Sequence, residues 1–446
     1  MHLMGNGMAN KTTSKSPAST RETKKDLAFR GIFLAAFTLF AATFSVPLAK
    51  AQEVDWRSEL EFLANELPKR HVNLFAKVDE ETFNRKVAEL SETIGKMDAA
   101  TATMELMKLV AMIGDGHTTV VPDQTSYRYF RVNVRWFKSG IHVRAIDERH
   151  KGLVGAKLTA VGDVKAKSLE QKFAELFSHD NIWGVRKAID KQFPTFEYLK
   201  FAGATNPDDT ATFHFEKDGT KRSITLNAVA VKDFRKKRIV NSFHIGMMKK
   251  SVFLDLMMKD EKGFPHWNDW IAPEKTLYFK YNQCRDAKGF QKLVDGTARF
   301  VEQNPVQKFV LDLRDNSGGN SLIFKPLLKY LAGNKTLNRE GKLFVLVGRD
   351  TFSSGLFAAM DMKKTNAIFI GEPTGCKPNH FGEVQTFTLP GSKLSVQYST
   401  KSFTLASDDT DTFKPDIEIT YTPKEFLTAF DPALNAVFKF EESSKK

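Results

Sequence analysis

The amino-acid sequence predicts an α/β protein core, preceded by a helical domain and a small β-rich module. Three short, almost entirely apolar runs at 309–313, 343–347 and 367–370 are typical of strands buried on both faces of a sheet. Helical segments alternate with these runs, and a β-α-β-α order favours an α/β core. Earlier in the chain, apolar residues first recur with helical spacing and then alternate with polar ones. The 446 residues suffice for two or three domains.

Residues 1–51 have the pattern of an export signal. Basic residues at 24–30 precede an apolar run at 31–46, and residues 49–51 (Ala-Lys-Ala) match the small-x-small pattern of a cleavage site. The run of about 16 residues is shorter than the ~20 that a membrane-spanning helix needs. We therefore expect an exported protein, periplasmic or extracellular, with an uncleaved membrane anchor as the alternative.

Residues 52–125 are predicted to form a helical N-terminal domain. Apolar residues recur there at spacings of three and four within 60–67, 83–94 and 104–113. Such spacing places them on one face of a helix, where they pack against a common core.

Residues 126–235 are predicted to form the β-rich module. Segments 132–136 and 141–145 alternate between apolar and polar residues, as half-buried strands do. The segment 155–163 (Gly-Ala-Lys-Leu-Thr-Ala-Val-Gly-Asp) resembles the strand and glycine turn of a PDZ-like module. Any strand that ends in a glycine turn has a similar pattern.

Residues 236–446 are predicted to form the α/β domain. Segment 277–279 is strand-like, and 290–302 has the pattern of an amphipathic helix. A further helix at 354–364 separates the last two apolar strands, which completes the β-α-β-α order.

The net charge and the cysteine content exclude several classes of protein. The formal charge is +13, but residues 1–51 hold seven basic and two acidic side chains, and the other basic residues form no stripe interleaved with aromatics. We therefore expect no nucleic-acid partner. Cys284 and Cys376 are too few for a disulfide-rich scaffold or a four-cysteine metal site, and the sequence leaves open whether they pair. No metal or nucleotide motif is present, so we expect no cofactor.

A buried strand that runs directly into two glycines is the first candidate for chemistry. The strand at 311–313 is followed by Arg314-Asp315-Asn316-Ser317-Gly318-Gly319. Glycines let the backbone approach a ligand and present N–H groups to it, as in an oxyanion hole. Most Gly-Gly pairs, however, only form a turn.

Two further segments carry residues suited to acyl transfer. Ser353 and Ser354 lie where a strand ends and a helix begins, a position typical of helix N-caps and also of nucleophiles. His117 lies on a tight turn between Gly116 and Thr118, where it is either an ordinary surface histidine or a general base.

Together the three segments resemble the tail-specific, or C-terminal processing, serine peptidases, whose relatives include the tricorn core protease and the retinoid-binding protein repeats. In that family D-L-R-x-N-x-G-G is followed by T-x-S-x and then by G-E-x-T-x-G. This chain has the corresponding segments at 312–319, 351–354 and 371–375. The resemblance implies a catalytic core of crotonase-like ββα layers and cleavage of peptides or unfolded protein tails without a cofactor.

The resemblance also assigns roles to individual residues. It implies that Ser353 is the nucleophile and that the N–H groups of Ser354 and of Gly318 or Gly319 form the oxyanion hole. Ser354 is the competing nucleophile because the two serines are adjacent.

The resemblance leaves two candidates for the general base. Some members of the family use a lysine shortly after the G-E-x-T motif, and Lys377 lies near that position. Others use a histidine with an acidic partner, which implies His117 and either Asp409 or Asp411 in the closing segment. We favour His117, with a Ser353–Lys377 dyad as the alternative. A non-catalytic binding protein and an esterase on the same fold are the other hypotheses, and the oligomeric state is left open.

Overall fold

The computed structural model describes residues 54–234 and 238–441. The chain divides into two compact units, Met1–Gln52 and Glu53–Lys446, and only the second is described here. The predicted export signal at 1–51 lies outside the described residues.

The α-helices are α1 (Trp56–Arg70), α2 (Glu80–Ser91), α3 (Ala99–Ala111), α4 (Ala166–Leu176), α5 (Ile182–Gln192), α6 (Phe196–Phe201), α7 (Val231–Phe234), α8 (Val252–Asp260), α9 (Ala287–Gln303), α10 (Lys325–Gly333), α11 (Ser354–Met362), α12 (Pro423–Leu427) and α13 (Pro432–Lys439). The short 3₁₀ helices are η1 (Leu74–Ala76), η2 (Ile94–Lys96), η3 (Gln124–Ser126), η4 (Glu148–Leu153) and η5 (Ser321–Phe324).

The strands are β1 (Thr119–Val121), β2 (Arg128–Tyr129), β3 (Val132–Phe137), β4 (Gly140–Asp147), β5 (Lys157–Val161), β6 (Val164–Lys165), β7 (Thr210–Lys217), β8 (Thr220–Asn227), β9 (Val229–Ala230), β10 (Ile239–Asn241), β11 (His266–Ile271), β12 (Thr276–Tyr281), β13 (Lys308–Asp312), β14 (Leu343–Val347), β15 (Ile368–Gly371), β16 (His380–Thr388), β17 (Ser395–Phe403) and β18 (Ile417–Glu418).

Helices α1, α2 and α3 lie where the helical periodicity predicts them. Each begins after an aspartate, Asp55, Asp79 or Asp98, whose side chain accepts hydrogen bonds from the backbone N–H groups of the first turn. Their apolar faces meet in a core that contains Leu63 and Leu106, both fully buried.

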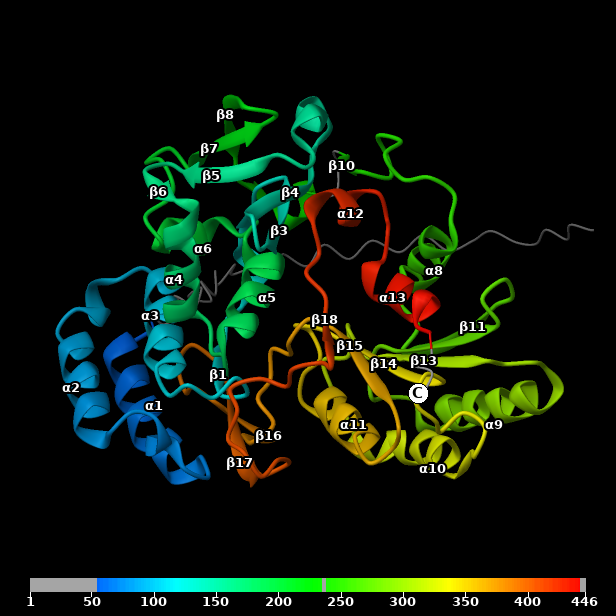
Figure 1. Ribbon diagram of the computed structural model, residues 1–446. Helices are drawn as coiled ribbons and strands as arrows, with labels where there is room; N and C mark the ends of the chain where they lie inside the picture. The colour runs from blue at the N-terminus through cyan, green and yellow to red at the C-terminus, as the bar shows by residue number, and fades with distance from the viewer. Residues whose placement is uncertain (1–53, 235–237, 442–446) are drawn as a thin grey trace, which may run out of the picture. The chain divides into compact units, whose positions relative to one another are not determined.

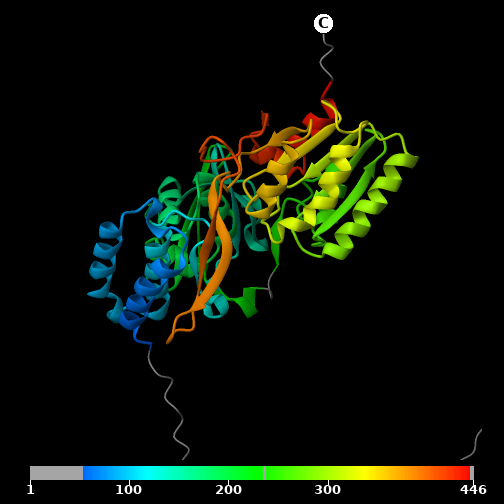
Figure 2. The same ribbon diagram turned by 90° about the horizontal axis from the view of Figure 1, so that it is seen from below.

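The hairpin β16–β17 packs on these N-terminal helices, although it comes late in the chain (Figures 1 and 2). Strand β17 pairs with β1, and Val396 of β17 belongs to the same apolar core as the helices. At the hairpin turn, the backbone N–H groups of Gly391 and Ser392 donate to the buried Glu59 of α1. The predicted domain 236–446 therefore contributes its hairpin to the N-terminal core, which the local sequence pattern does not indicate.

The β-rich module is an antiparallel sheet in the order β10-β4-β5-β7-β8, with β3 against β4 and β6 against β5. In β4, Ile141, Val143 and Ala145 are buried and the two residues between them are not, as the alternating sequence pattern predicts, and β3 follows the pattern at Val132 and Val134. Helices α4, α5 and α6 cover this sheet through Leu169, Ile189 and Leu199.

The C-terminal sheet has the order β11-β12-β13-β14-β15-β18, with β12 to β18 parallel and β11 antiparallel at one edge. Apolar residues of α9, α10 and α11 pack on one face, and those of α8 and α13 on the other (Figure 1). Helices on both faces explain why the central strands are apolar throughout. The predicted α/β class is confirmed.

Parallel strands bring the motifs at 312–319, 351–354 and 371–375 to one edge of this sheet. Strand β13 leads into 313–319, β14 into 348–353, and β15 into 372–376. Because the carboxyl ends of parallel strands meet at the same edge, these loops are neighbours. In open α/β sheets this edge is where ligands bind.

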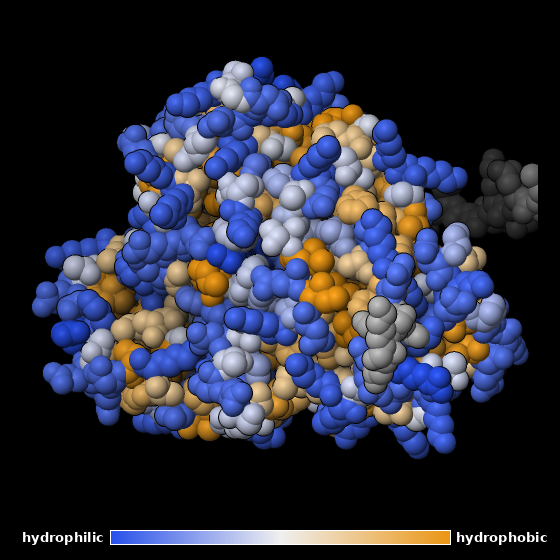
Figure 3. Space-filling view, viewed as in Figure 1, coloured by the Kyte–Doolittle hydropathy of each residue, from blue (hydrophilic) through white to orange (hydrophobic). Residues whose placement is uncertain are grey.

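The face seen in Figure 3 is covered mainly by hydrophilic residues, with apolar residues in small separate groups. Within 54–234 and 238–441, no helix is long and apolar enough to cross a membrane. The same ranges contain no group of three or more histidine, cysteine or acidic residues arranged to hold a metal ion.

Candidate active site

Ser353 lies between the end of β14 and the first residue of α11. Its backbone has a φ of 51° and a ψ of −127°, a conformation that residues other than glycine rarely adopt. Its side chain makes no capping hydrogen bond to the helix, so Ser353 does not cap α11 with its hydroxyl. A strained serine at a strand-to-helix turn is how α/β hydrolases expose their nucleophile.

The hydroxyl of Ser354, in contrast, is already used within the fold. It donates to the carbonyl oxygen of Gly319 at 2.6 Å, and the residue is buried. This bond ties the start of α11 to the glycine pair. Of the two adjacent serines, Ser353 is the one whose hydroxyl has no hydrogen-bond partner among the described residues.

Gly318 lies directly against Ser353 and Gly319 against Cys284, and the two glycines have φ values of 109° and 128°. A Cβ atom on Gly318 would lie 2.8 Å from the Cβ and 3.2 Å from the Oγ of Ser353, so no side chain fits there. The N–H of Gly318 donates to the side chain of Asn316 at 2.9 Å. Within the described chain, the N–H groups of Gly319 and Ser354 have no acceptor, which leaves these two as candidate oxyanion donors.

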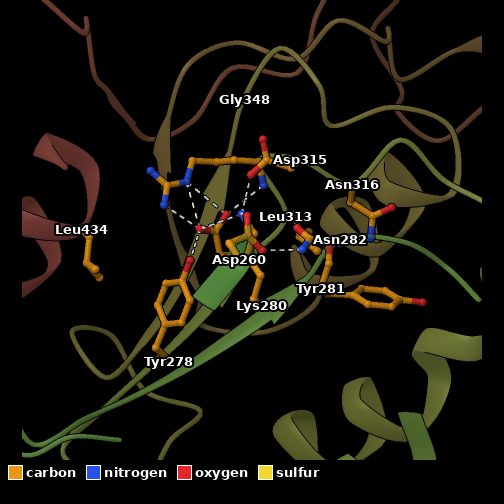
Figure 4. A network of polar contacts seen from close by, with 12 residues as sticks. Asp260, Tyr278, Lys280, Tyr281, Asn282, Leu313, Asp315, Asn316, Gly348 and Leu434 are labelled. Carbon is orange, nitrogen blue, oxygen red and sulfur yellow. Dashed lines mark hydrogen bonds and ion pairs between the residues drawn. The ribbon is translucent and has the colours of Figure 1, made fainter. Parts of the chain in front are cut away.

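A buried ionic network fixes the strand end that carries the glycine pair (Figure 4). Asp312 accepts hydrogen bonds from Tyr278 and Arg314, and the ammonium group of Lys280 lies 3.4 Å from the same carboxylate. Burial alone would raise the pKa of Asp312, but the charges of Arg314 and Lys280 outweigh it and hold that pKa well below its ordinary range. Beyond the strand, buried Asn316 donates to the carbonyl of Tyr281 at 2.8 Å.

His117 lies on the turn after α3, and its imidazole is buried beside the nucleophile loop. The ring stacks on Phe352, with 4.4 Å between centroids, and on His380, with 5.4 Å. Neither ring nitrogen has a hydrogen-bond partner among the described residues, so no bond to the hydroxyl of Ser353 is present. Burial lowers the pKa of His117, although the charges of Asp180 and Asp115 oppose this. The imidazole is therefore neutral near pH 7, as a general base must be.

Asp115 holds the turn that carries His117. Its carboxylate accepts hydrogen bonds from Ser399 at 2.6 Å, from Thr118 at 2.5 Å and from the backbone N–H of His117 at 3.0 Å, and it contacts His71 at 3.1 Å. The Nδ1 atom of His117 lies 3.8 Å from this carboxylate, beyond hydrogen-bond reach.

None of the other sequence-predicted residues makes a hydrogen bond to the ring nitrogens of His117. The ammonium of Lys377 pairs with the carboxylate of Asp409 at 2.8 Å. Asp411 is exposed, and its carbonyl oxygen accepts a hydrogen bond from the side chain of Asn181. Lys377 and Asp409 both line a cavity of about 220 Å³, which Asp115 also lines.

Three residues near Ser353 were missed by the sequence analysis. The thiol of Cys376 donates to the carbonyl of Lys377 at 3.7 Å, and burial, together with the charge of Asp180, raises its pKa. Both cysteines are free, which answers the pairing question. The ammonium of Lys187 lies 4.7 Å from the ring centre of Phe352, and burial lowers its pKa. Only Cys376 had a local signal, because it directly follows the G-E-P-T-G segment.

No protein-family model matches the sequence, and no curated protein matches it. Several solved structures are similar to the chain. The structure of mature CPAF complexed with lactacystin superposes with a TM-score of 0.56 at 12% identity, over 86% of this chain and 97% of that chain. A second structure of mature CPAF gives 0.56 at 12% identity, over 86% and 96%. This chain has the fold of CPAF. The photosystem II D1 C-terminal processing protease gives a TM-score of 0.40 at 13% identity, over 86% and 97%.

The similarity to CPAF extends over 86% of the chain. At this identity the comparison establishes the fold, so the chemistry has to be argued from the residues of this chain. In this chain, Ser353 and the glycine pair lie at one edge of the C-terminal sheet, and the turn after α3 places the imidazole of His117 beside them.

Proposed function

We propose that this protein is a serine peptidase that cleaves peptides or unfolded protein tails through an acyl-enzyme. One observation carries the proposal. Ser353 has a strained backbone at a helix start, its hydroxyl is not used as a cap, and Gly318 lies against it. This is how a nucleophile beside an oxyanion hole is built.

In the proposed reaction, the Oγ atom of Ser353 attacks the scissile carbonyl carbon while His117 takes the hydroxyl proton. The N–H groups of Ser354 and Gly319 stabilise the negative oxygen that forms, and each such donor contributes about 10²–10³ in rate. His117 then gives its proton to the leaving amine, and the C–N bond breaks. A water molecule, activated by the same imidazole, hydrolyses the acyl-enzyme.

The choice of His117 over Lys377 is supported by the charges around each group. His117 is buried and neutral near pH 7, and no hydrogen bond holds its ring nitrogens elsewhere. Lys377 is paired with the carboxylate of Asp409 at 2.8 Å. A lysine base would have to leave that carboxylate and lose its proton before it could act. A Ser353–Lys377 dyad remains the alternative mechanism.

We also propose a type for each of the two sheets and a location for the protein. The antiparallel module of β3 to β10 is proposed to be PDZ-like and to capture a substrate segment by strand addition. The C-terminal sheet is proposed to be crotonase-like. The sequence at 1–51 supports export to the periplasm or beyond, where unfolded protein tails would be substrates.

The test compares two serine-to-alanine variants. Ser353→Ala should lose both cleavage of an unfolded protein, such as casein, and labelling by a fluorophosphonate. The control Ser354→Ala removes the neighbouring hydroxyl and should keep labelling at Ser353. Circular dichroism establishes that both variants are folded. Cleavage by the Ser353→Ala variant at the wild-type rate would refute the mechanism, and faster hydrolysis of simple esters than of peptides would indicate an esterase.

A non-catalytic binding protein is the second candidate, and one observation favours it. His117 makes no hydrogen bond to Ser353, and such a bond is the usual sign of an activated nucleophile. Catalytic hydrogen bonds often form only with substrate bound. A folded wild-type protein that neither reacts with fluorophosphonate nor cleaves an unfolded protein would establish this candidate instead.

A further inference from the structure

Asp180 joins the segments that carry the proposed base and nucleophile. It lies just before α5, one residue ahead of the N-cap Asn181. One carboxylate oxygen accepts the N–H of Gly116 at 2.8 Å, and the other accepts the N–H of Lys377 at 3.4 Å. A Cβ on Gly116 would lie 2.9 Å from Asp180 and 3.2 Å from the ring of Phe352, so the turn is held closely between them.

The same carboxylate lies beside Cys376, next to the nucleophile loop. The thiol of Cys376 donates to the carbonyl of Lys377 at 3.7 Å, and both Asp180 and the backbone N–H of Ser353 are near enough to affect its pKa. Asp180 therefore contacts the residue before His117 on one side and, on the other, the segment Cys376–Lys377 that adjoins Ser353.

Asp180 also has the larger electrostatic effect of the two carboxylates that face His117. Asp180 and Asp115 both favour the protonated imidazole, in that order of size, whereas His380 of β16 and Lys187 of α5 oppose it. Asp115 is largely occupied by its hydrogen bonds to Thr118, Ser399 and the turn.

We infer that Asp180 is the positioning carboxylate of this site: it orients the His117 turn toward Ser353 and stabilises the imidazolium formed when His117 accepts the serine proton. The inference rests on the proposed function. It replaces Asp409 and Asp411 in the acidic role, because Asp409 is paired with Lys377 and Asp411 is exposed.

The test measures the pKa of His117 by nuclear magnetic resonance, using the ring C–H signal that disappears in His117→Asn. Asp180→Asn should lower this pKa by about 1, because an opposite charge is lost. It should also lower kcat about 10- to 100-fold with little change in KM, and move the acid limb of kcat/KM to lower pH. Asp180→Glu should restore most of the pKa and of kcat.

The matched control is Asp295→Asn, which removes an exposed carboxylate from α9 and should change neither value. If Asp180→Asn does not fold, Asp180→Ser removes the charge and retains an acceptor for the N–H of Gly116. An unchanged His117 pKa in the uncharged variants would overturn the inference. So would Asp409→Asn or Asp411→Asn producing the predicted fall instead. The titration needs no turnover, so an inactive wild-type protein would refute the proposed function while the Asp180–His117 pair is still measured.

Discussion

Ser353 and Gly318 approach each other so closely that each restricts the residue type at the other position. The Cβ position of Gly318 is 2.8 Å from the Cβ of Ser353, and the φ of Gly318 is 109°. Gly318→Ala should therefore displace the nucleophile and lower kcat/KM by at least about 10²-fold, comparable to the loss of an oxyanion donor. Active-site titration with a fluorophosphonate measures the effect.

Gly333→Ala is the control for this substitution. Gly333 ends α10, and a Cβ there would meet nothing within 4 Å. Alanine also has a higher helix propensity than glycine, so this variant should be as stable as wild type and fully active. Equal activity of the two variants would contradict the close packing of Gly318 on Ser353.

The pH dependence of activity is a second prediction at the residue scale. Burial places the pKa of His117 below its ordinary value of about 6.5, and the base acts only when neutral. The acid midpoint of kcat/KM should therefore lie below pH 6.5, and it should be the same in Lys377→Met. A rate that continues to rise well above pH 7, and that is lost in Lys377→Met, would identify lysine as the base.

At the scale of elements, the end of β13 depends on a buried charge network. Asp312 is fully buried between Tyr278, Lys280 and Arg314. Asp312→Asn leaves two cations without their shared carboxylate, and breaking such a buried pair typically costs about 3–5 kcal/mol. We expect the free energy of unfolding, measured with urea, to fall by that order.

Asp361→Asn is the matched control, because it removes the same charge from a residue of α11 that pairs with the exposed Lys364. Exposed pairs contribute little to stability, so the urea midpoint should hardly change. The pKa of Asp312 is lowered on folding, so its contribution is present above the unfolded pKa of about 3.9 and is lost as the pH falls further. Equal destabilisation in both variants would refute the role of the network.

At the scale of the whole second unit, Arg349 joins the β-rich module to the loop before Ser353. Its guanidinium donates to Glu372 at 2.6 Å, to Asp190 of α5 at 3.1 Å and to the carbonyl of Trp136 at 3.1 Å. Arg349→Met removes the nearer cation from two buried carboxylates and leaves them Arg135, at 3.7 Å from Asp190 and 3.6 Å from Glu372. It should destabilise the protein by up to about 3–5 kcal/mol. Arg85→Met, which removes an exposed pair with Glu89 on α2, should leave the melting temperature unchanged.

The α/β class and the strand-to-helix position of Ser353 could be predicted because their signals are local. Continuous apolar strands and a Gly-Gly turn are visible in a few consecutive residues. The hairpin β16–β17 and the positions of Asp180 and Lys187 could not be predicted. They depend on which distant surfaces pack together, and an aspartate before a helix has the same local pattern whether or not an imidazole lies opposite it.

The order in which the chain is made has a consequence for when the site can exist. The turn with His117, the carboxylate of Asp180 and the hydroxyl of Ser353 come from the helical, β-rich and α/β parts in turn. The hairpin that carries Ser399 to Asp115 and His380 to the imidazole is made last of these. A growing chain on the ribosome therefore lacks the complete set of groups until this hairpin has been made.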